Sequence, residues 1–166
     1  MSLRAIVLAA GRGTRMHSEV PKVLFPIAGR PLLAWVLDAV AGVSPDETLA
    51  VVGHGADQVA ALLPAGVRAV VQEPQLGTGH AVMAALAAMG EVAGDTVLVV
   101  PGDTPLLRPE TLRALVAALP GATAALLTTR MPDPAGYGRV RREGDRVLGI
   151  VEDRDATPEQ RAIDEV

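Results

Sequence analysis

Aliphatic residues follow two patterns along the chain, and together these patterns predict an alternating series of strands and helices. Short runs made mostly of aliphatic residues, typical of strands buried on both faces, occupy residues 3–8, 48–52, 67–71 and 96–100. Apolar residues spaced three or four positions apart, typical of one helix face, occupy residues 31–41, 57–63, 78–89 and 109–119. Pro31 and Pro109 suit first helical turns, and Gly42 suits a helix end.

The order of these elements predicts an α/β fold with a Rossmann-like, mostly parallel sheet and helices on both of its faces. A fifth strand is predicted at residues 122–129. Residues 139–142 and 146–151 flank Glu143-Gly144-Asp145, which predicts a hairpin. In such sheets ligands bind at the carboxyl ends of the strands, where the strand order reverses. Candidate binding and catalytic residues are therefore expected in the loops that follow strands.

Composition narrows the class of protein. Apolar residues make up 49% of the chain, with one Trp, one Tyr and one Phe, so the core must be aliphatic. The net charge of −4 argues against a nucleic-acid partner. No apolar run reaches the roughly 18 residues of a membrane span. Without cysteine there is no disulfide framework, and we expect a cytoplasmic location. The length suits a single domain over residues 1–166.

A glycine-rich loop, LAAGRGTRM at residues 8–16, follows the first predicted strand. Small residues let backbone N–H groups approach a phosphate closely. The loop lacks the Gly-Lys-Ser/Thr of a Walker motif, and Met16 replaces the third glycine of the dinucleotide fingerprint. Arg15 and Lys22 can place two cations around a polyphosphate. An ordinary strand-to-turn connection with two solvated cations remains the alternative at this point.

This loop, with PKVL at residues 21–24 and GRPL at residues 29–32, resembles the signature of the sugar-nucleotide pyrophosphorylases. The resemblance implies that Arg15 neutralises the departing diphosphate and that Lys22 contacts the reacting phosphates. It also implies contacts to the nucleotide from Leu8, Ala9, Ala10 and Gly11.

A second candidate segment, QEPQLGTGH at residues 72–80, follows the third predicted strand and opens a helix. Gln72 carries both a donor and an acceptor, as reading a pyrimidine edge requires. Gly77 and Thr78 lie at the helix start, beside backbone N–H groups without helical partners. A plain helix N-terminus explains the spacing equally well. The segment QLGTGHA, however, resembles the uracil-recognising part of N-acetylglucosamine-1-phosphate uridylyltransferases, which implies UTP contacts from Gln72, Gly77 and Thr78.

The segment VPGDTPL at residues 100–106 ends the fourth predicted strand. Mg²⁺ favours a carboxylate together with water and phosphate oxygens, and Asp103 supplies a carboxylate here. A turn or capping role for Asp103 is the alternative. The family resemblance implies that Asp103 is the Mg²⁺ ligand and that Pro101 and Gly102 also contact substrate. His54 and His80 have no second ligand at metal spacing, and we interpret them as structural.

The sugar side is predicted at the hairpin, which GYGR at residues 136–139 opens and VEDRDAT at residues 151–157 closes. These are ordinary hairpin residues by composition. Their resemblance to the N-acetylglucosamine enzymes implies that the backbone of Gly138 approaches an N-acetyl sugar. It further implies that Glu152 accepts hydrogen bonds from the sugar hydroxyls.

The resemblance implies transfer of a uridylyl group from UTP to N-acetylglucosamine-1-phosphate, giving diphosphate and UDP-N-acetylglucosamine, a precursor of peptidoglycan. Arg15, Lys22 and Asp103 are the expected catalytic residues. The family's domain extends beyond Val166, so we expect a truncated domain without the β-helix acetyltransferase domain and without the trimer it builds. Two alternatives stay open: another sugar-1-phosphate nucleotidyltransferase, using GTP or CTP, and a non-catalytic nucleotide-binding module of the same fold.

Overall fold

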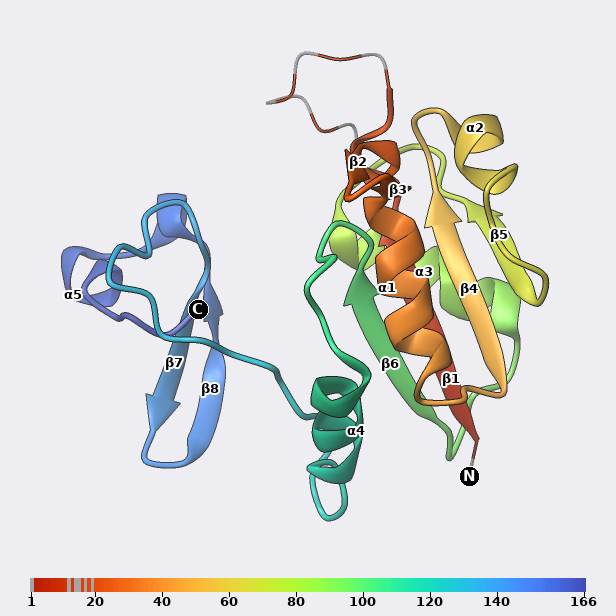
Figure 1. Ribbon diagram of the computed structural model, residues 1–166. Helices are drawn as coiled ribbons and strands as arrows, with labels where there is room; N and C mark the ends of the chain where they lie inside the picture. The colour runs from red at the N-terminus through yellow and green to blue at the C-terminus, as the bar shows by residue number, and fades with distance from the viewer. Residues whose placement is uncertain (1, 12, 14–15, 17, 19) are drawn as a thin grey trace. The chain divides into compact units, whose positions relative to one another are not determined.

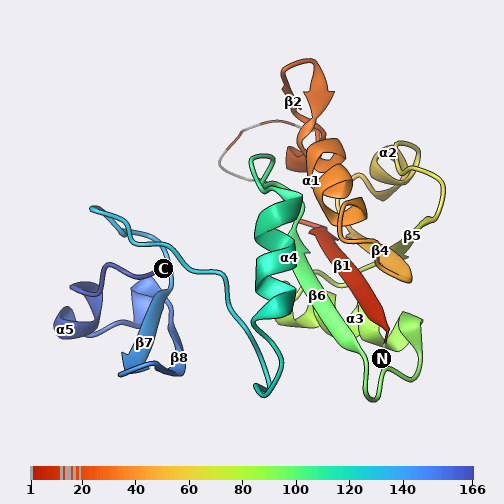
Figure 2. The same cartoon turned by 60° about the horizontal axis from the view of Figure 1, so that its bottom comes forward.

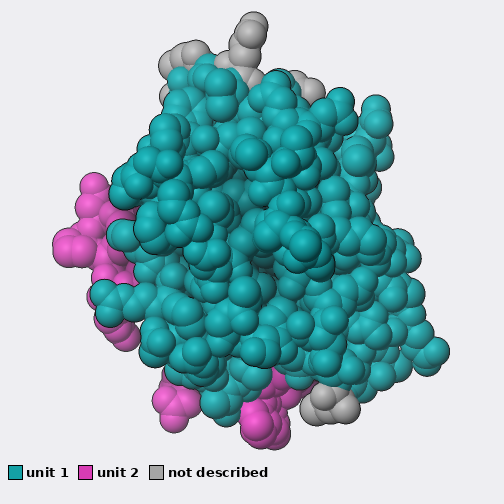
Figure 3. Space-filling model, turned by 45° about the vertical axis from the view of Figure 1, so that its right-hand side comes forward, with its two compact units in different colours: residues 1–118 teal, residues 119–166 magenta. Residues whose placement is uncertain are grey.

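The structure, a computed structural model, describes residues 2–11, 13, 16, 18 and 20–166. The chain forms two compact units, Met1–Ala118 and Leu119–Val166, which Figure 3 draws in different colours. Among the described residues, no helix is long and apolar enough to cross a membrane.

A four-stranded sheet forms the centre of the first unit (Figure 1). Its strands are β1 (Leu3–Ala9), β4 (Glu47–Val52), β5 (Val67–Val71) and β6 (Thr96–Pro101). The spatial order is β5-β4-β1-β6, and every neighbouring pair is parallel. The chain thus runs outward from β1 to β5 and then returns to the other side of β1. The strand order reverses between β1 and β6, so their carboxyl ends form the position where ligands bind in open α/β sheets.

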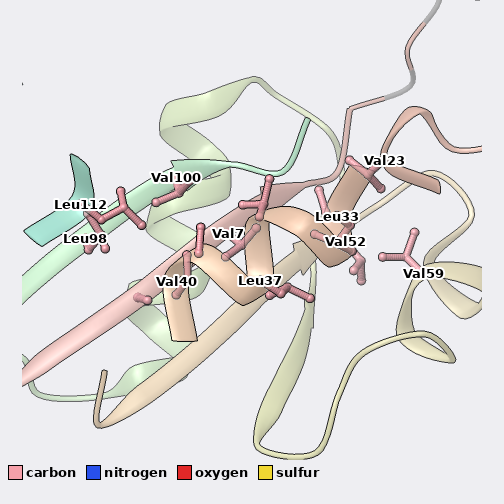
Figure 4. Close-up of a cluster of buried hydrophobic side chains, with 14 residues drawn as sticks. Val7, Val23, Leu33, Leu37, Val40, Val52, Val59, Leu98, Val100 and Leu112 are labelled. Carbon is pink, nitrogen blue, oxygen red and sulfur yellow. The ribbon is translucent and has the colours of Figure 1, made fainter. Parts of the chain in front are cut away.

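Helices cover both faces of this sheet (Figures 1 and 2). Three helices, α1 (Leu32–Ala41), α2 (Ala56–Ala60) and α4 (Pro109–Ala117), contribute to the apolar cluster on one face. Figure 4 shows this cluster, in which Leu33 and Val40 of α1 lie near strand residues such as Val7. The helix α3 (Thr78–Met89) packs on the opposite face through alanines and Met89. The predicted fold class is therefore confirmed.

The strand β1 shows why residues 5–9 form an unbroken aliphatic run. Ala5 and Val7 belong to the cluster on the α1 face, whereas Ile6 belongs to the cluster on the α3 face. Successive side chains of a strand point to opposite faces, and both faces of this strand are covered. All three residues are fully buried. The strand that carries the glycine-rich loop is therefore anchored from both sides.

Short elements without a clear sequence pattern lie between the glycine-rich loop and α1. A 3-10 turn, η2 (Lys22–Leu24), precedes a small antiparallel pair of β2 (Pro26–Ile27) and β3 (Arg30–Pro31). These elements span only two or three residues each, which is too short for a periodic pattern to predict.

The second unit contains the predicted hairpin. Strands β7 (Arg139–Glu143) and β8 (Arg146–Val151) pair antiparallel around Gly144, which has a φ of 56°. They are followed by η3 (Asp153–Asp155) and by the short helix α5 (Pro158–Arg161). The side chain of Thr157 caps α5, and Gln160 completes a capping box.

The strand predicted at residues 122–129 is wrong. This segment forms no strand, and an isolated bridge joins the following Arg130 to Glu165. Thr129 and Val166 exchange two backbone hydrogen bonds of 2.9 Å, and Met131 donates to the carbonyl of Asp164 across 2.9 Å, so the hydrogen-bonded ladder includes only the last residue of the predicted segment. A strand is defined by such a ladder, and its apolar residues must be covered. Leu126 and Leu127 remain exposed instead.

Candidate functional site

A cavity of about 550 Å³ lies in the first unit and is lined by loops that follow β1, β5 and β6. Its volume is typical of small-molecule sites. The residues that line it include Leu8, Ala10, Gly11, Gly13, Lys22, Gln72, Gln75, Gly77, Thr78, Pro101 and Asp103. Most of the residues predicted to contact the nucleotide therefore come together around one cavity.

Close backbone contact joins the loops after β1 and β6. The N–H of Gly102 donates to the carbonyl of Leu8 across 2.9 Å. A Cβ atom at residue 102 would lie only 2.8 Å from that carbonyl oxygen, so a side chain there would push the loops apart. Gly102 thus holds the Asp103 loop against the glycine-rich loop. Ala9, the last residue of β1, is buried, so the start of the glycine-rich loop is anchored in the core.

Two charged side chains meet at the cavity. Lys22 Nζ donates to Asp103 Oδ2 across 2.6 Å, and the side chains are 42% and 33% exposed. Lys22 opens η2, while Asp103 directly follows Gly102 at the end of β6. A half-exposed ion pair contributes little to stability, so it does not by itself explain why both charges stand at the cavity. It brings one cation and one carboxylate within reach of the same ligand. Arg15, the other predicted cation, lies outside the described residues.

The carboxylate of Asp103 is suited to bind a divalent cation that is also bound by substrate phosphates. Its Oδ2 atom already lies against a positive charge, the ammonium group of Lys22. Within the part of the chain that the structure describes, no cluster of three or more His, Cys, Asp or Glu side chains could hold a metal. Mg²⁺ is commonly bound through one or two carboxylates together with substrate phosphates and waters. Asp103 supplies one carboxylate of the kind that such a site uses.

Gln72 follows β5 and is only 4% exposed. Its backbone N–H donates to the carbonyl of Val52, which extends the β4–β5 pairing by one bond. Its side-chain Nε2 lies 2.9 Å from the carbonyl oxygen of Gly77 and 3.1 Å from His80 Nδ1. Gln72 therefore spans the loop between β5 and α3, and its side chain is held in place at the cavity.

The start of α3 also faces the cavity. Gly77 is the N-cap residue with a φ of 101°, a conformation that L side chains rarely adopt, and Thr78 is the first helical residue. The first N–H groups of a helix have no partner within the helix, and the helix dipole favours negative charge there. This helix end is therefore suited to polar or anionic parts of a ligand.

Gly138 and Glu152, the residues predicted to contact the sugar, belong to the second unit. Gly138 is adjacent to Tyr137, and Glu152 is adjacent to Asp153. Tyr137 and Asp153 are both hydrogen-bond partners of Arg139, which is buried and only 2% exposed. Its guanidinium donates to the carbonyl of Tyr137 and, across 3.0 Å, to Asp153 Oδ1. Arg139 thereby ties the segment around Gly138 to the segment around Glu152.

Sequence reasoning missed some of the cavity's lining residues. Gln75, Met16, Val23 and Ala81 line it without having been assigned a role. Gln75 is a polar residue within the QLGTGHA segment, so its position was a usable signal. Val23 and Ala81 gave no signal, because a buried aliphatic residue looks the same at a cavity as in a core. His80, interpreted as structural from the sequence, contacts Gln72 directly.

The parallel sheet carries a cavity at the carboxyl ends of its strands, and comparison with known families identifies the class of protein as an NTP transferase domain. Residues 5–157 match the MobA-like NTP transferase domain family. The chain belongs to this family.

Individual known proteins are also similar to this chain. The bifunctional protein GlmU of Paracidovorax citrulli is 55% identical over 172 residues, which cover 99% of this chain and 36% of that protein. The chain thus spans little more than a third of that relative's length. A crystal structure of UDP-glucose pyrophosphorylase with UDP-glucose matches with a TM-score of 0.81 at 17% identity, covering 100% of this chain and 74% of the other, and shows the same fold. Rv0371c of Mycobacterium tuberculosis, in complex with manganese, matches 72% of this chain and 60% of its own with 27% identity and a TM-score of 0.59.

Proposed function

We propose that this chain transfers a uridylyl group from UTP to N-acetylglucosamine-1-phosphate in a Mg²⁺-dependent reaction. The observation that carries the proposal is the single cavity that Lys22, Asp103 and Gln72 all line. Lys22 and Asp103 offer charges for the phosphates, and Gln72 offers polar groups for a base. The similarity to bifunctional GlmU proteins supports the same substrates.

In the proposed reaction, a phosphate oxygen of the sugar-1-phosphate attacks the α-phosphorus of UTP. A new phosphorus–oxygen bond forms, the bond between the α-phosphorus and the bridging oxygen breaks, and diphosphate leaves with the electron pair. Lys22 offsets negative charge on the phosphates, and we assign the same role to Arg15. When bound at Asp103, Mg²⁺ would supply further positive charge to the phosphate oxygens. Catalysis then comes from alignment and charge stabilisation, as is usual for phosphoryl-type transfer.

The remaining contacts divide between the two units. Backbone groups of the loop after β1 and of Pro101 and Gly102 would surround the nucleotide. Gln72, Gly77 and Thr78 would contact the uracil base. In the second unit, the backbone of Gly138 and the carboxylate of Glu152 would contact the N-acetyl sugar. Arg139 would keep the segments that carry these two residues together.

The test is to incubate the purified protein with Mg²⁺, N-acetylglucosamine-1-phosphate and each of UTP, CTP and GTP, and to follow products by ³¹P NMR. We expect UDP-N-acetylglucosamine and diphosphate from UTP alone. Lys22→Met, which keeps the length of the side chain but removes its charge, should lower the rate by roughly 100-fold, the effect of losing one charge-stabilising donor. Preferred turnover of GTP or CTP would favour another sugar-1-phosphate nucleotidyltransferase. Binding of UTP without turnover would favour a non-catalytic module.

A further inference from the structure

We infer that His80 is a positioning residue that fixes the side-chain amide of Gln72 so that its carbonyl oxygen is presented to the base, which selects uracil over cytosine. This inference rests on the proposed function, because it concerns the base that the cavity accepts.

The orientation of the Gln72 amide follows from its partners. The atom of the amide closest to the carbonyl oxygen of Gly77 lies 2.9 Å away. A backbone carbonyl only accepts hydrogen bonds, so this atom must be the NH₂ nitrogen. Gly77 presents its carbonyl from a backbone conformation, with a φ of 101°, that favours glycine.

The position of the same nitrogen determines which tautomer a neutral His80 ring adopts. His80 Nδ1 lies 3.1 Å from Gln72 Nε2. Since Gln72 Nε2 is a donor, Nδ1 must accept, and the ring proton is on Nε2 of His80. The imidazole therefore acts here as an acceptor, which is more specific than a packing role.

These two bonds use both N–H groups of the Gln72 amide. Gln72 is 4% exposed and lines the cavity, so its remaining polar atom, the carbonyl oxygen Oε1, is the one it can offer a ligand. An acceptor matches the N3–H group of uracil. The N3 atom of cytosine carries a lone pair instead of a hydrogen, and it would face the carbonyl oxygen without a hydrogen bond. A turned amide, with NH₂ toward the base, would reverse this preference.

His80 is needed to keep the amide from turning. Without the imidazole, one N–H of a nearly buried amide loses its acceptor, and an unmatched buried donor is costly. The present orientation then keeps only its bond to Gly77, and the turned orientation becomes more competitive. The preference for UTP over CTP should therefore depend on an acceptor at position 80.

The test is calorimetric titration of the wild-type protein, His80→Phe and His80→Asn with UTP and with CTP, each in the presence of Mg²⁺. We expect His80→Phe to lower the ratio of UTP to CTP affinity by roughly three- to tenfold, which corresponds to one hydrogen bond. His80→Asn, whose side-chain oxygen can accept from the amide, should keep most of the wild-type ratio. If His80 only supports packing, both affinities fall together and the ratio stays unchanged, which would overturn the inference.

A second measurement needs no variant. Long-range ¹H–¹⁵N spectra of the wild-type protein report which ring nitrogen of His80 carries the proton. A neutral ring protonated on Nε2 supports the inference, and a neutral ring protonated on Nδ1 overturns it. Failure of the proposed function gives a different result: the wild-type protein would bind GTP better than UTP, or would show no preference for UTP over CTP. The second of these outcomes would overturn the inference as well.

Discussion

The first unit buries two clusters of aliphatic side chains, one on each face of its sheet, whereas the second unit, all of which the structure describes, buries very little apolar surface. In the second unit Val140 and Ala156 are the buried apolar residues, and Arg139 and Glu165 are buried beside them. Both charged residues have ion-pair partners, Asp153 for Arg139 and Arg142 for Glu165. The first unit is therefore held mainly by hydrophobic burial and the second mainly by charge-assisted hydrogen bonds.

This difference has consequences for the proposed substrates. The cavity of the first unit is lined in part by the loop after β1, a strand that is packed on both faces, so the core fixes this part of the cavity's geometry. The sugar contacts proposed for the second unit depend on the guanidinium of Arg139, which bonds to Tyr137 and Asp153. Substitutions should therefore affect the two halves of the reaction differently.

The largest expected effect is on metal-dependent nucleotide binding. Asp103→Asn keeps the size of the side chain but removes the carboxylate that we propose as the Mg²⁺ ligand. The increase in UTP affinity that Mg²⁺ produces should disappear, because a neutral amide is a poor ligand for a hard cation. Calorimetric titrations with UTP, with and without Mg²⁺, measure this. The thermal midpoint should stay close to that of the wild type, since Asp103 is partly exposed. An unchanged response to Mg²⁺ would place the metal elsewhere.

A large effect on stability is expected from the core of the first unit. Leu49 is fully buried in β4, and Leu49→Ala should lower the free energy of unfolding by about 3 kcal/mol through lost burial and a cavity. Val140→Ala in the second unit removes less apolar surface and should cost about 1–2 kcal/mol.

Hydrogen exchange followed residue by residue separates these two effects. Protection should fall mainly in β1, β4 and β6 for Leu49→Ala, and mainly in the hairpin for Val140→Ala. Equal loss of protection in both units from either substitution would show that the chain unfolds as one cooperative body, and it would contradict the contrast drawn between the units.

The second unit should respond to acid through Glu165. Hydrogen bonds from Arg142, and then from Thr128, lower the pKa of the Glu165 carboxyl from 4.5 to about 2. A carboxyl with a lowered folded-state pKa stabilises the folded state above its unfolded-state pKa. That stabilisation is lost as the pH falls from about 4.5 toward 2. As the pH falls through this interval, amide exchange in the hairpin should therefore become faster relative to the intrinsic rate expected at each pH. Glu165→Gln should reduce this pH dependence, and a variant with the wild-type profile would rule out Glu165 as its source.

The smallest effect is expected from Arg139→Lys. A lysine keeps the charge but cannot bond to Tyr137 and Asp153 with the same planar fork, so Gly138 and Glu152 lose their common support. Affinity for UDP-N-acetylglucosamine should fall a few-fold, on the order of one weakened hydrogen bond, while affinity for UTP should not change. Competitive displacement of a fluorescent UTP analogue by each ligand measures both. Equal losses for the two ligands would show that Arg139 matters only for folding.

The same contrast explains how far the sequence predicts this molecule. In the first unit, strands β5 and β6 and helix α3 lie where short, mostly aliphatic runs and helical spacing place them, because local patterns of this kind follow from the packing of helices on a sheet. In the second unit, residues 122–129 have a strand-like composition but form no ladder. The contact between Arg142 and Glu165 joins positions far apart in the chain, and no local pattern predicts such a pair.

The candidate site divides in a similar way. Loops after strands could be predicted, since parallel strands place their carboxyl ends at one edge. The ion pair between Lys22 and Asp103 could not be predicted, because the two residues meet only when the chain returns to the far side of β1. The hydrogen bond from Gln72 to His80 also escaped prediction, as a lone histidine on a helix is uninformative by itself.

The central claim is that the cavity of the first unit binds UTP while the second unit contacts the sugar, and NMR chemical-shift mapping tests it most directly. The ¹⁵N-labelled protein would be titrated with UTP and then, separately, with UDP-N-acetylglucosamine, both with Mg²⁺. The account predicts that UTP shifts the amides of Gly11, Gly77 and Gly102 and leaves Gly138 and Glu152 unchanged. UDP-N-acetylglucosamine should shift both sets. Shifts from UTP confined to the second unit, or no shifts around the cavity with either ligand, would contradict it.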